Sequence, residues 1–506
     1  MLATIHSGTV QGVEGLPVAV EVDIALGLPV MATVGLPDSS VRESKDRVKA
    51  AIRNCGYEFP GRRITVNLAP ADVKKAGAGF DLPIALGILA ASGALESVSL
   101  AHYCVLGELA LDGALRPVRG VLPVALAARK QGLKGMIVPV ENGLEAAVVD
   151  GLAVIPVRTL PEAVEFLAGR VQMEPLQVDP VALFARAWRY DVDFNEVKGQ
   201  EQVKRALEIA AAGGHNICLK GPPGSGKTML ARRLPTILPD LSFPEALETS
   251  KIYSIAGLLP DDLPLMATRP FRAPHHTISD AGLVGGGQVP RPGEVSLAHN
   301  GVLFLDELPE FKKHVLEVLR QPLEDGSVTI ARASVSLRFP ARVVLAAAYN
   351  PCPCGYYGDK RKECTCTPQQ IQRYESRLSG PLLDRIDLHL EVPALAYEEM
   401  SGERQGESSK VIKARVDAAR GIQSVRYQGL DRIYCNALMG PGELERYCVL
   451  EQASSALLEK SVRRLGLSAR GYTRILKIAR TIADLAGSES IKTAHLAEAI
   501  QYRRLA

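Results

Sequence analysis

One eight-residue segment constrains this chain more than any other: residues 221–228 read Gly-Pro-Pro-Gly-Ser-Gly-Lys-Thr. The segment matches the phosphate-loop pattern GxxxxGK[ST], in which glycines let backbone N–H groups converge on phosphate oxygens. It follows a short apolar run at 217–219 and precedes a helical pattern that begins at Met229. A strand, a loop and a helix N-terminus in this order predict a site for a nucleoside triphosphate.

Each position of this loop has an expected task. Lys227 is expected to reach the β- and γ-phosphates, and the Thr228 hydroxyl to take one Mg²⁺ position. The residues predicted to line the phosphates are Gly221, Pro222, Pro223, Gly224, Ser225, Gly226, Lys227 and Thr228.

Length and composition limit the class of protein. The 506 residues suffice for roughly two to four domains, and 47% hydrophobic with 23% charged residues is typical of a globular protein. A net charge of +3 means that any surface for nucleic acid must come from local clustering. The N-terminus lacks a signal-peptide pattern, and the longest apolar stretch, 82–95, is too short to span a bilayer. We therefore expect a cytoplasmic protein without membrane association.

The chain divides by pattern into four segments. Residues 1–170 alternate strand-like and helix-like runs, 171–192 read as a linker, 193–400 form a second α/β segment, and 401–506 are helical. The expected strands are 64–68, 135–140, 152–157, 217–219, 302–305 and 343–348, and the expected helices are 82–91, 411–427, 451–465, 469–486 and 493–505.

Two carboxylates end an apolar strand of the second α/β segment. Residues 302–305 read Val-Leu-Phe-Leu and are followed by Asp306 and Glu307. Ligands gather at the carboxyl ends of buried parallel strands. We therefore expect Asp306 to hold Mg²⁺ and Glu307 to act as the general base on the attacking water.

The next apolar strand begins at Val343 and ends in the polar amide of Asn350, which is placed to orient the attacking water. Its alternative role is that of a turn residue in an Asn-Pro pair. Arg385 lies in the sequence Leu-Leu-Asp-Arg-Ile-Asp at 382–387. An arginine there can act on a neighbouring subunit's nucleotide, or form a surface salt bridge with a flanking aspartate.

Four of the nine cysteines form two Cys-x-Cys pairs: Cys352, Cys354, Cys364 and Cys366. Four thiolates can close a tetrahedral zinc site, and such clustering favours a metal in a reducing compartment over a disulfide framework. Free thiols in a mobile loop, or a redox pair, are the alternatives. A bound metal would fix the basic residues 360–362 close to Asn350, where they can contact DNA phosphates.

The order of these motifs resembles that of AAA+ ATPases. A hairpin is expected from Leu323 through Arg338, ahead of the third motif strand, and resembles the clade of magnesium chelatase motors and MCM-type helicases. Four further segments resemble the ComM/YifB branch of that clade: Ala211–Asn216, Arg272–His276, Gly285–Gly287 and Pro292–Asn300. Adjacent side chains point in different directions, so His275 and His276 are expected to serve structure or nucleotide sensing, not metal binding.

The resemblance to the ComM/YifB branch implies an ATP- and Mg²⁺-dependent motor that assembles as a homohexamer. It implies a helicase or branch-migration activity on single-stranded and branched DNA, in homologous recombination and natural transformation. It also implies that Arg385 completes the neighbour's site and that Arg470 contacts the γ-phosphate, with Arg474 as the second candidate. The arginines that can track a DNA backbone are Arg332, Arg338, Arg342, Arg463, Arg464, Arg474 and Arg480.

The segments Pro70–Asp72, Gly77–Pro83 and Gly107–Leu109 with Gly113 carry a further resemblance: residues 36–135 resemble the Lon-protease-like (S5-type) domain. A protease of this family needs a serine and a lysine, whereas Gly79 and Leu122 occupy the matching positions. We therefore expect an assembly or DNA-binding role for this domain. The expected fold class is α/β: a Lon-like N-terminal α/β domain, an AAA+ P-loop core with a parallel sheet, and a C-terminal helical lid.

Two other functions remain open. One is a chelatase-type motor that remodels a protein or metal-insertion partner. Such motors usually lack the Lon-like N-terminal domain and the four-cysteine segment 352–366. The other is an ATP-dependent protease, which the missing nucleophile disfavours. DNA-stimulated ATP hydrolysis separates the DNA motor from both.

Overall fold

The computed structural model describes residues 1–95, 100–179, 190–260, 263–287, 290–332, 335–359, 362–378, 380–394, 406–430 and 433–503. These residues fall into two compact units, Met1–Trp188 with Phe243–Ala267, and Arg189–Ser242 with Thr268–Ala506. Residues 243–267, which the sequence pattern places within the ATPase segment, therefore group with the N-terminal unit. Residues 180–189 of the expected linker lie outside the described residues, as do residues 401–405 at the expected boundary of the helical segment.

The first unit is built on a seven-stranded mixed sheet in the order β3-β4-β2-β1-β5-β8-β9. Its strands are β1 (Leu2–Gln11), β2 (Glu14–Ala25), β3 (Met31–Val34), β4 (Arg63–Ala69), β5 (Tyr103–Val105), β8 (Gly135–Pro139) and β9 (Ala153–Val157). β1 and β2 form an antiparallel hairpin with Leu2 opposite Asp23, and Gly12 supplies the positive φ of +64° that its tight turn requires. β5, β8 and β9 continue the sheet in parallel.

The helices of this unit are α1 (Ser39–Asn54), α2 (Asp81–Ala91), α3 (Val121–Lys130), α4 (Val140–Ala147), α5 (Leu160–Leu167) and α9 (Phe243–Ala256). Every residue of α2 is buried, which explains the long apolar stretch as a core helix. Helix α9 joins the unit through the Ser254 hydroxyl, which donates to the buried Glu145 carboxylate. A two-stranded ribbon, β6 (Glu108–Leu109) with β7 (Leu115–Arg116), lies between β5 and α3 in the chain.

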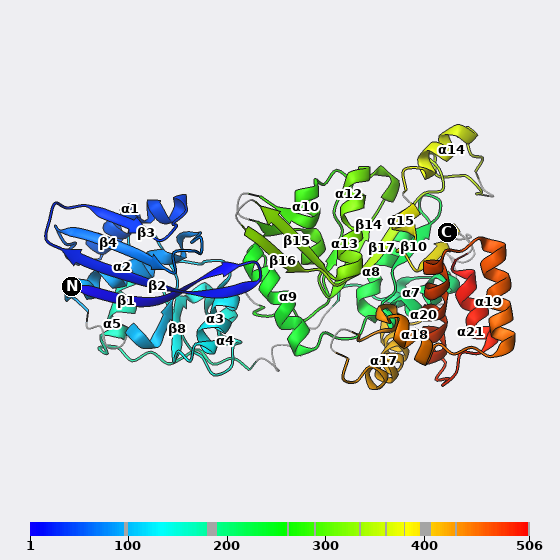
Figure 1. Cartoon of the computed structure of the whole chain (residues 1–506). Coiled ribbons are helices and arrows are strands. Elements are labelled where there is room, and N and C mark those ends of the chain that lie inside the picture. The colour runs from blue at the N-terminus through cyan, green and yellow to red at the C-terminus, as the bar shows by residue number, and fades with distance from the viewer. Residues whose placement is uncertain are drawn as a thin grey trace. The chain divides into compact units, whose positions relative to one another are not determined.

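The second unit holds a five-stranded parallel sheet in the order β11-β14-β17-β10-β18 (Figure 1). Its strands are β11 (Phe271–Arg272), β14 (Gly301–Leu305), β17 (Val343–Tyr349), β10 (Ile217–Lys220) and β18 (Leu388–Glu391). Every residue of β14 is buried, as expected for a parallel strand covered on both faces. The three strands predicted for this segment are confirmed, each extended by one residue.

Helices surround this sheet and continue into the C-terminal region. They are α7 (Glu201–Gly213), α8 (Lys227–Ile237), α10 (Asp280–Val284), α11 (Glu294–Leu297), α12 (Lys313–Val318), α13 (Arg320–Asp325), α14 (Pro368–Glu375), α15 (Gly380–Leu383), α17 (Ser409–Arg426), α18 (Pro441–Tyr447), α19 (Gln452–Leu465), α20 (Ala469–Leu485) and α21 (Thr493–Gln501). The α/β fold with a parallel sheet and a C-terminal helical region is thus confirmed. Among the described helices, none combines the length and the apolar character needed to cross a membrane.

The expected hairpin is present but starts later than predicted. β15 (Ser327–Arg332) pairs antiparallel with β16 (Val335–Pro340), whereas residues 323–325 belong to α13. Gly326, with φ +62°, ends α13 in a left-handed cap and turns the chain into β15. A second small ribbon pairs β12 (Gly285–Gly286) with β13 (Arg291–Pro292).

Candidate nucleotide site

The phosphate loop joins β10 to α8, as the sequence predicts. Gly224 and Gly226 adopt φ values of +74° and +85°, which residues with a Cβ rarely tolerate. Gly221 is needed for space, because a Cβ there would lie 2.3 Å from the carbonyl oxygen of Val392. The glycines therefore let the loop turn tightly beside the end of β18 and open its N–H groups toward a ligand.

Lys227, the first residue of α8, turns its ammonium group back into the loop. Its Nζ atom donates to the carbonyl oxygens of Gly221 at 2.8 Å and Pro222 at 2.9 Å, and to Oδ1 of Asn350 at 3.2 Å. Burial lowers the pKa of Lys227, and the Asp306 carboxylate only partly opposes this. A buried ammonium with mainly neutral partners favours the arrival of an anion such as a phosphate.

Thr228 and Asp306 form the polar pair expected at a magnesium site. The Thr228 hydroxyl donates to Oδ2 of Asp306 at 2.7 Å, and Oδ1 of Asp306 accepts the Glu307 N–H at 2.9 Å. One hydroxyl and one carboxylate are oxygen ligands of the type that Mg²⁺ uses while keeping several waters. The chemistry of this donor set therefore fits Mg²⁺ bound with a nucleotide.

Glu307 has a partner that the sequence did not predict. It lies in the left-handed region with φ +52°, and its Oε2 is 3.1 Å from Nδ1 of His276. His276 comes four residues after β11, the strand beside β14, so the sheet brings the two side chains together. Its ring also meets Phe311 edge-on. Only the position of Arg272–His276 after a short strand could have indicated this contact.

Arg385 and Arg470 converge on Glu324 and not on the phosphate loop. Arg385 is 4% exposed and donates to the Glu324 carboxylate and to the carbonyl oxygen of Pro381. Arg470 is exposed, with Nη2 3.6 Å from the same Glu324 oxygen. Both arginines would have to leave Glu324 to reach a nucleotide, so their assigned roles remain predictions.

Arg474, the second candidate for the γ-phosphate contact, binds inside the unit. It donates to Asp387 and, at 2.8 Å, to the carbonyl oxygen of Arg385. Burial opposes the charge on Asp387, but Arg474, His215 and the Asn216 N–H together hold the pKa of this carboxyl below its ordinary value. Burial lowers the pKa of His215, which favours a neutral ring beside the carboxylate.

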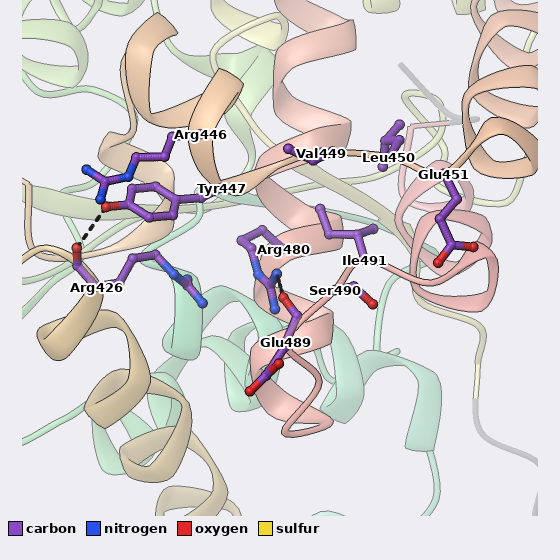
Figure 2. Close-up of a pocket in the computed structure, with 10 residues that line it drawn as sticks. All are labelled: Arg426, Arg446, Tyr447, Val449, Leu450, Glu451, Arg480, Glu489, Ser490 and Ile491. Atoms are coloured by element: carbon purple, nitrogen blue, oxygen red, sulfur yellow. Dashed lines mark hydrogen bonds between the residues drawn. The ribbon is translucent and has the colours of Figure 1, made fainter.

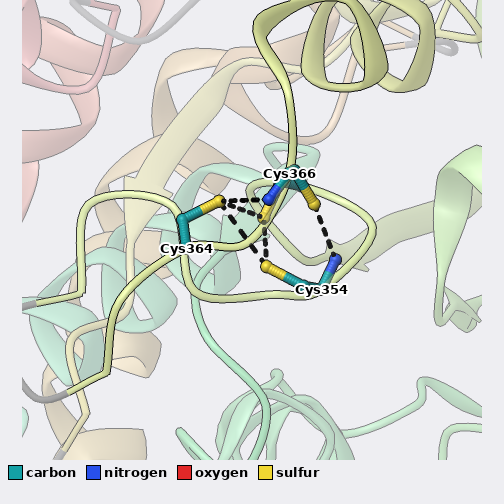
Figure 3. Close-up of side chains that lie close together, drawn as sticks. Cys354, Cys364 and Cys366 are labelled. Atoms are coloured by element: carbon teal, nitrogen blue, oxygen red, sulfur yellow. Dashed lines mark hydrogen bonds between the residues drawn. The ribbon is translucent and has the colours of Figure 1, made fainter.

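The four predicted cysteines come together in the second unit. Their Sγ atoms all lie within 4.8 Å of one another, and Figure 3 shows three of them turned inward. The S···S distances are 3.3, 3.7 and 3.6 Å for the pairs Cys352–Cys354, Cys352–Cys364 and Cys354–Cys364. A tetrahedron with Zn–S bonds of about 2.3 Å has S···S edges of about 3.8 Å, whereas a disulfide needs about 2.05 Å.

Backbone N–H groups support these sulfurs as thiolates. The N–H of Tyr357 donates to Sγ of Cys352, and that of Cys354 to Sγ of Cys366. Backbone N–H groups, with that of Tyr356 as the largest contribution, lower the pKa of Cys354 to about 5. Burial and the neighbouring thiols outweigh such donors at the other pair and raise the pKa of Cys364 to about 12 and that of Cys366, so a cation is needed to ionise all four. Zinc binds thiolates, so the donor set fits a zinc ion on chemistry as well as on distance.

Comparison with known proteins places the chain in a family. Residues 193–400 match the family described as magnesium chelatase, subunit ChlI; residues 20–142 match subunit ChlI of Mg-chelatase, and 406–503 its C-terminal part. The competence protein ComM of Haemophilus influenzae is 46% identical over 100% of this chain and 98% of its own length. The chain belongs to the ComM/YifB family.

Two further relatives, one similar over the full length and one more distant, agree with this family membership. The uncharacterized protein YifB of Escherichia coli K12 is 46% identical over 100% of this chain and 97% of its own. The magnesium-chelatase 38 kDa subunit of Rhodobacter capsulatus is 26% identical over 60% of this chain and 84% of its own. The resemblance inferred from the motifs is thereby confirmed at the level of the family.

The arginines of this ComM/YifB chain are not equally available to DNA. Arg480 is buried and binds Asp484 and two backbone carbonyls, and Arg474 is tied to Asp387, so neither can track a phosphate backbone. The exposed members of the predicted set are Arg338, Arg342, Arg463 and Arg464, and the side chain of Arg332 lies outside the description. Lys360 and Arg361 also lie outside the described residues.

A cavity of about 300 Å³ lies in the C-terminal helical region (Figure 2). Arg426 at its edge binds both oxygens of Asp484, at 2.7 and 2.6 Å, and Arg446 stacks over Tyr447 with 5.1 Å between the guanidinium carbon and the ring centroid. Glu451 and Glu489 also line it. Internal pairing and acidic neighbours cancel its basic charge, so we assign it no anion.

Proposed function

We propose that this chain is a ring-forming ATPase that couples hydrolysis of ATP to movement on DNA. It would act as a helicase or branch-migration motor in homologous recombination and natural transformation. The observation that carries the proposal is the meeting of three strand ends, where Lys227 contacts Asn350 and Thr228 contacts Asp306. Full-length identity of 46% to a protein named for competence supports the link to DNA.

Each side chain at these strand ends has one role in the proposed hydrolysis. Lys227 binds the β- and γ-phosphates, and Thr228 with Asp306 holds Mg²⁺, which neutralises phosphate charge when bound. Glu307 takes a proton from the attacking water, and Asn350 holds that water in line. Among residues 221–226, Gly224 and Gly226 offer backbone N–H groups for the phosphates, because Pro222 and Pro223 have none and those of Gly221 and Ser225 donate to carbonyl oxygens.

The proposed ring is a homohexamer with a nucleotide between neighbouring subunits. Arg385 would neutralise transition-state charge in the neighbour's site, and Arg470 would contact the γ-phosphate, with Arg474 as its alternative. Because Arg385 binds Glu324 within its own chain, assembly or nucleotide binding would have to break that pair.

Single-stranded and branched DNA are the proposed partners, in the cytoplasm. The exposed Arg338 and Arg342 on and beside the β15–β16 hairpin, and Arg463 and Arg464 on α19, offer sequence-independent phosphate contacts. The first unit is proposed to be a Lon-like domain without proteolysis, because residues 70–91 contain no serine and the position of the lysine is Leu122, which is buried.

The cysteine cluster is proposed to bind one zinc ion through Cys352, Cys354, Cys364 and Cys366. The support is the near-tetrahedral spacing of the sulfurs and the N–H donors around them. Metal analysis of the purified full chain should find one zinc per chain. The Cys354→Ser variant should lose it, whereas Cys448→Ser, at a buried thiol outside the cluster, should retain it.

The deciding experiment follows a labelled four-way DNA junction with ATP and Mg²⁺. The wild-type protein should exchange strands, and Glu307→Gln should bind ATP but not exchange them. ATP hydrolysis without action on any branched DNA would instead favour a chelatase-type motor with a protein or metal-insertion partner, in keeping with the chelatase families matched along the chain.

A further inference from the structure

The first Cys-x-Cys pair and the residue after it, 352–355, lie directly against the phosphate loop, 221–228. Gly355, the residue after Cys354, has φ +87°, and a Cβ built on it would lie 2.5 Å from Cδ and 2.6 Å from Cγ of Pro223. The same Cβ would be 3.8 Å from Cγ of Asn350. Gly355 therefore packs on the centre of the phosphate loop, and only a glycine leaves room for that approach.

The cysteine loop is also joined covalently to the strand end that contacts Lys227. Asn350 is two residues before Cys352, which is fully buried. The N–H of Gly355 donates to the carbonyl oxygen of Cys352 at 3.0 Å, so the turn 352–355 is fixed at both ends. The conformation of this turn therefore decides where Gly355 lies relative to Pro223.

We propose that the four-cysteine loop is a wall of the nucleotide site. A metal ion on the four thiolates holds the turn 352–355 in place, and Gly355 thereby positions the phosphate loop through Pro223. The inference rests on the proposed ATPase function and on the proposed metal. It extends them, because it gives the metal a task in nucleotide binding in place of, or besides, a task in DNA binding.

The metal is expected to fix this turn because of the charge that the four clustered sulfurs carry when they are ionised. Four thiolates within 4.8 Å of one another need a cation between them, and without it the sulfurs take up protons, so the segments 352–354 and 364–366 lose the metal bonds that join them. The turn then has more conformations available, and the phosphate loop loses the surface that keeps Pro223 in place. Ordering that loop would have to accompany nucleotide binding, and the affinity would fall.

The chain offers a matched pair of glycines for the test. Gly358 lies in the same loop with nearly the same φ, +82°, but a Cβ there would meet nothing within 4 Å. Gly355→Ala and Gly358→Ala therefore carry a similar backbone strain, and only Gly355→Ala presses on Pro223. The probe is fluorescently labelled ADP with Mg²⁺, and zinc content and circular dichroism are measured on the same full-length samples.

Gly355→Ala is expected to weaken labelled-ADP binding at least about tenfold relative to Gly358→Ala, with zinc content equal in both. Pro223→Ala removes the ring atoms that the new Cβ would meet, so the double variant Pro223→Ala/Gly355→Ala should recover affinity relative to Gly355→Ala alone. Removing zinc from the wild type with a chelator should weaken binding in the same direction, and restoring zinc should reverse it.

The outcomes separate this inference from the function on which it rests. Equal affinity of the two alanine variants, or full affinity in zinc-free protein that remains folded, overturns the inference while leaving an ATPase intact. Absence of nucleotide binding by zinc-loaded wild type overturns the proposed function itself. If Gly355→Ala fails to fold, the chelation and Pro223→Ala measurements still decide the question.

Discussion

Nζ of Lys227 lies 3.2 Å from Oδ1 of Asn350, although the two residues are 123 positions apart in the chain. The contact exists because β10 and β17 are parallel neighbours and both end at the same edge of the sheet. A charge-bearing group and a neutral amide thus share the place where phosphate oxygens would arrive. Removing Lys227 and removing Asn350 should therefore impair different steps, nucleotide binding in one case and hydrolysis in the other.

Lys227→Ala should abolish nucleotide binding, because it deletes the only ammonium seen within the phosphate loop. Asn350→Ala should keep binding and lower kcat about 100-fold, since it removes a group that acts on the attacking water. Steady-state ATPase kinetics and labelled-nucleotide titration distinguish the two. Lys220→Ala is the control, because Lys220 ends β10 but pairs with Glu375 at the surface. A loss of binding in Asn350→Ala would contradict this division of roles.

Much of this site follows from strand-end residues read in the sequence. Lys227, Thr228, Asp306 and Asn350 meet as predicted, because a parallel sheet aligns the ends of its strands. The partners of the arginines could not be predicted from the sequence, since a long side chain can turn either to a neighbouring subunit or to an acid of its own chain. Residue patterns give no means of choosing, and the structure shows Arg385 on Glu324.

The sequence also could not predict which of the two units helix α9 belongs to. It directly follows the ATPase helix α8 in the chain, yet it packs in the N-terminal unit. Its alternation of apolar and polar residues does not reveal which core it joins. One hydrogen bond that joins it to this unit, from Ser254 to Glu145, links residues 109 positions apart, which no local pattern indicates.

Arg385 acting in trans predicts complementation between two inactive proteins. Arg385→Ala and Glu307→Gln should each lower ATPase activity about 1000-fold. In an equal mixture, some sites combine Glu307 from one subunit with Arg385 from the next, and activity should return to about a quarter of wild type. A mixture as inactive as its components would assign Arg385 a structural role with Glu324 inside one chain.

The contact between His276 and Glu307 predicts a distinction between two amide substitutions. His276→Ala should lower kcat roughly 10- to 100-fold with little change in KM, because the Glu307 carboxylate loses a neighbour that fixes its position. The contact is made by Nδ1, which the amide nitrogen of Asn matches in reach. His276→Asn should therefore restore activity better than His276→Gln, measured as ATPase kcat.

His314→Ala is the control for His276, because His314 is exposed and its Nε2 lies 3.3 Å from Asp280. It should keep the wild-type kcat. A rise in hydrolysis in His276→Ala would instead mean that the histidine restrains Glu307.

Asp387 predicts a defined pH dependence of stability in the second unit. Its pKa is held below the ordinary value, so its ionised form stabilises the folded state above the unfolded pKa of about 3.9, and this stabilisation is lost as pH falls below that value. Asp387→Asn should cost about 3 kcal/mol at pH 7, because Arg474 is left without its carboxylate. The difference in urea midpoint between variant and wild type should shrink below about pH 4.

Asp417→Asn provides the comparison for Asp387, since the Asp417 carboxylate is exposed and its partner Lys413 keeps a second carboxylate, Asp240. It should change the free energy of unfolding by less than about 1 kcal/mol at any pH. A pH-independent difference for Asp387→Asn would contradict the depressed pKa.

The buried carboxylate of Glu145 should be the main attachment of α9 to the N-terminal unit. It accepts hydrogen bonds from the Leu122 N–H at 3.0 Å, the Asn142 amide at 3.1 Å and the Ser254 hydroxyl. Glu145→Ala leaves these donors without an acceptor and should cost about 2–3 kcal/mol, whereas Ser254→Ala removes one donor and should cost about 1 kcal/mol. Lys251→Ala, which breaks only the surface pair of α9 with Glu14, should cost less than about 0.5 kcal/mol. Limited proteolysis within 243–267 should follow the same order, and equal protection in all three variants would mean that apolar packing alone holds this helix.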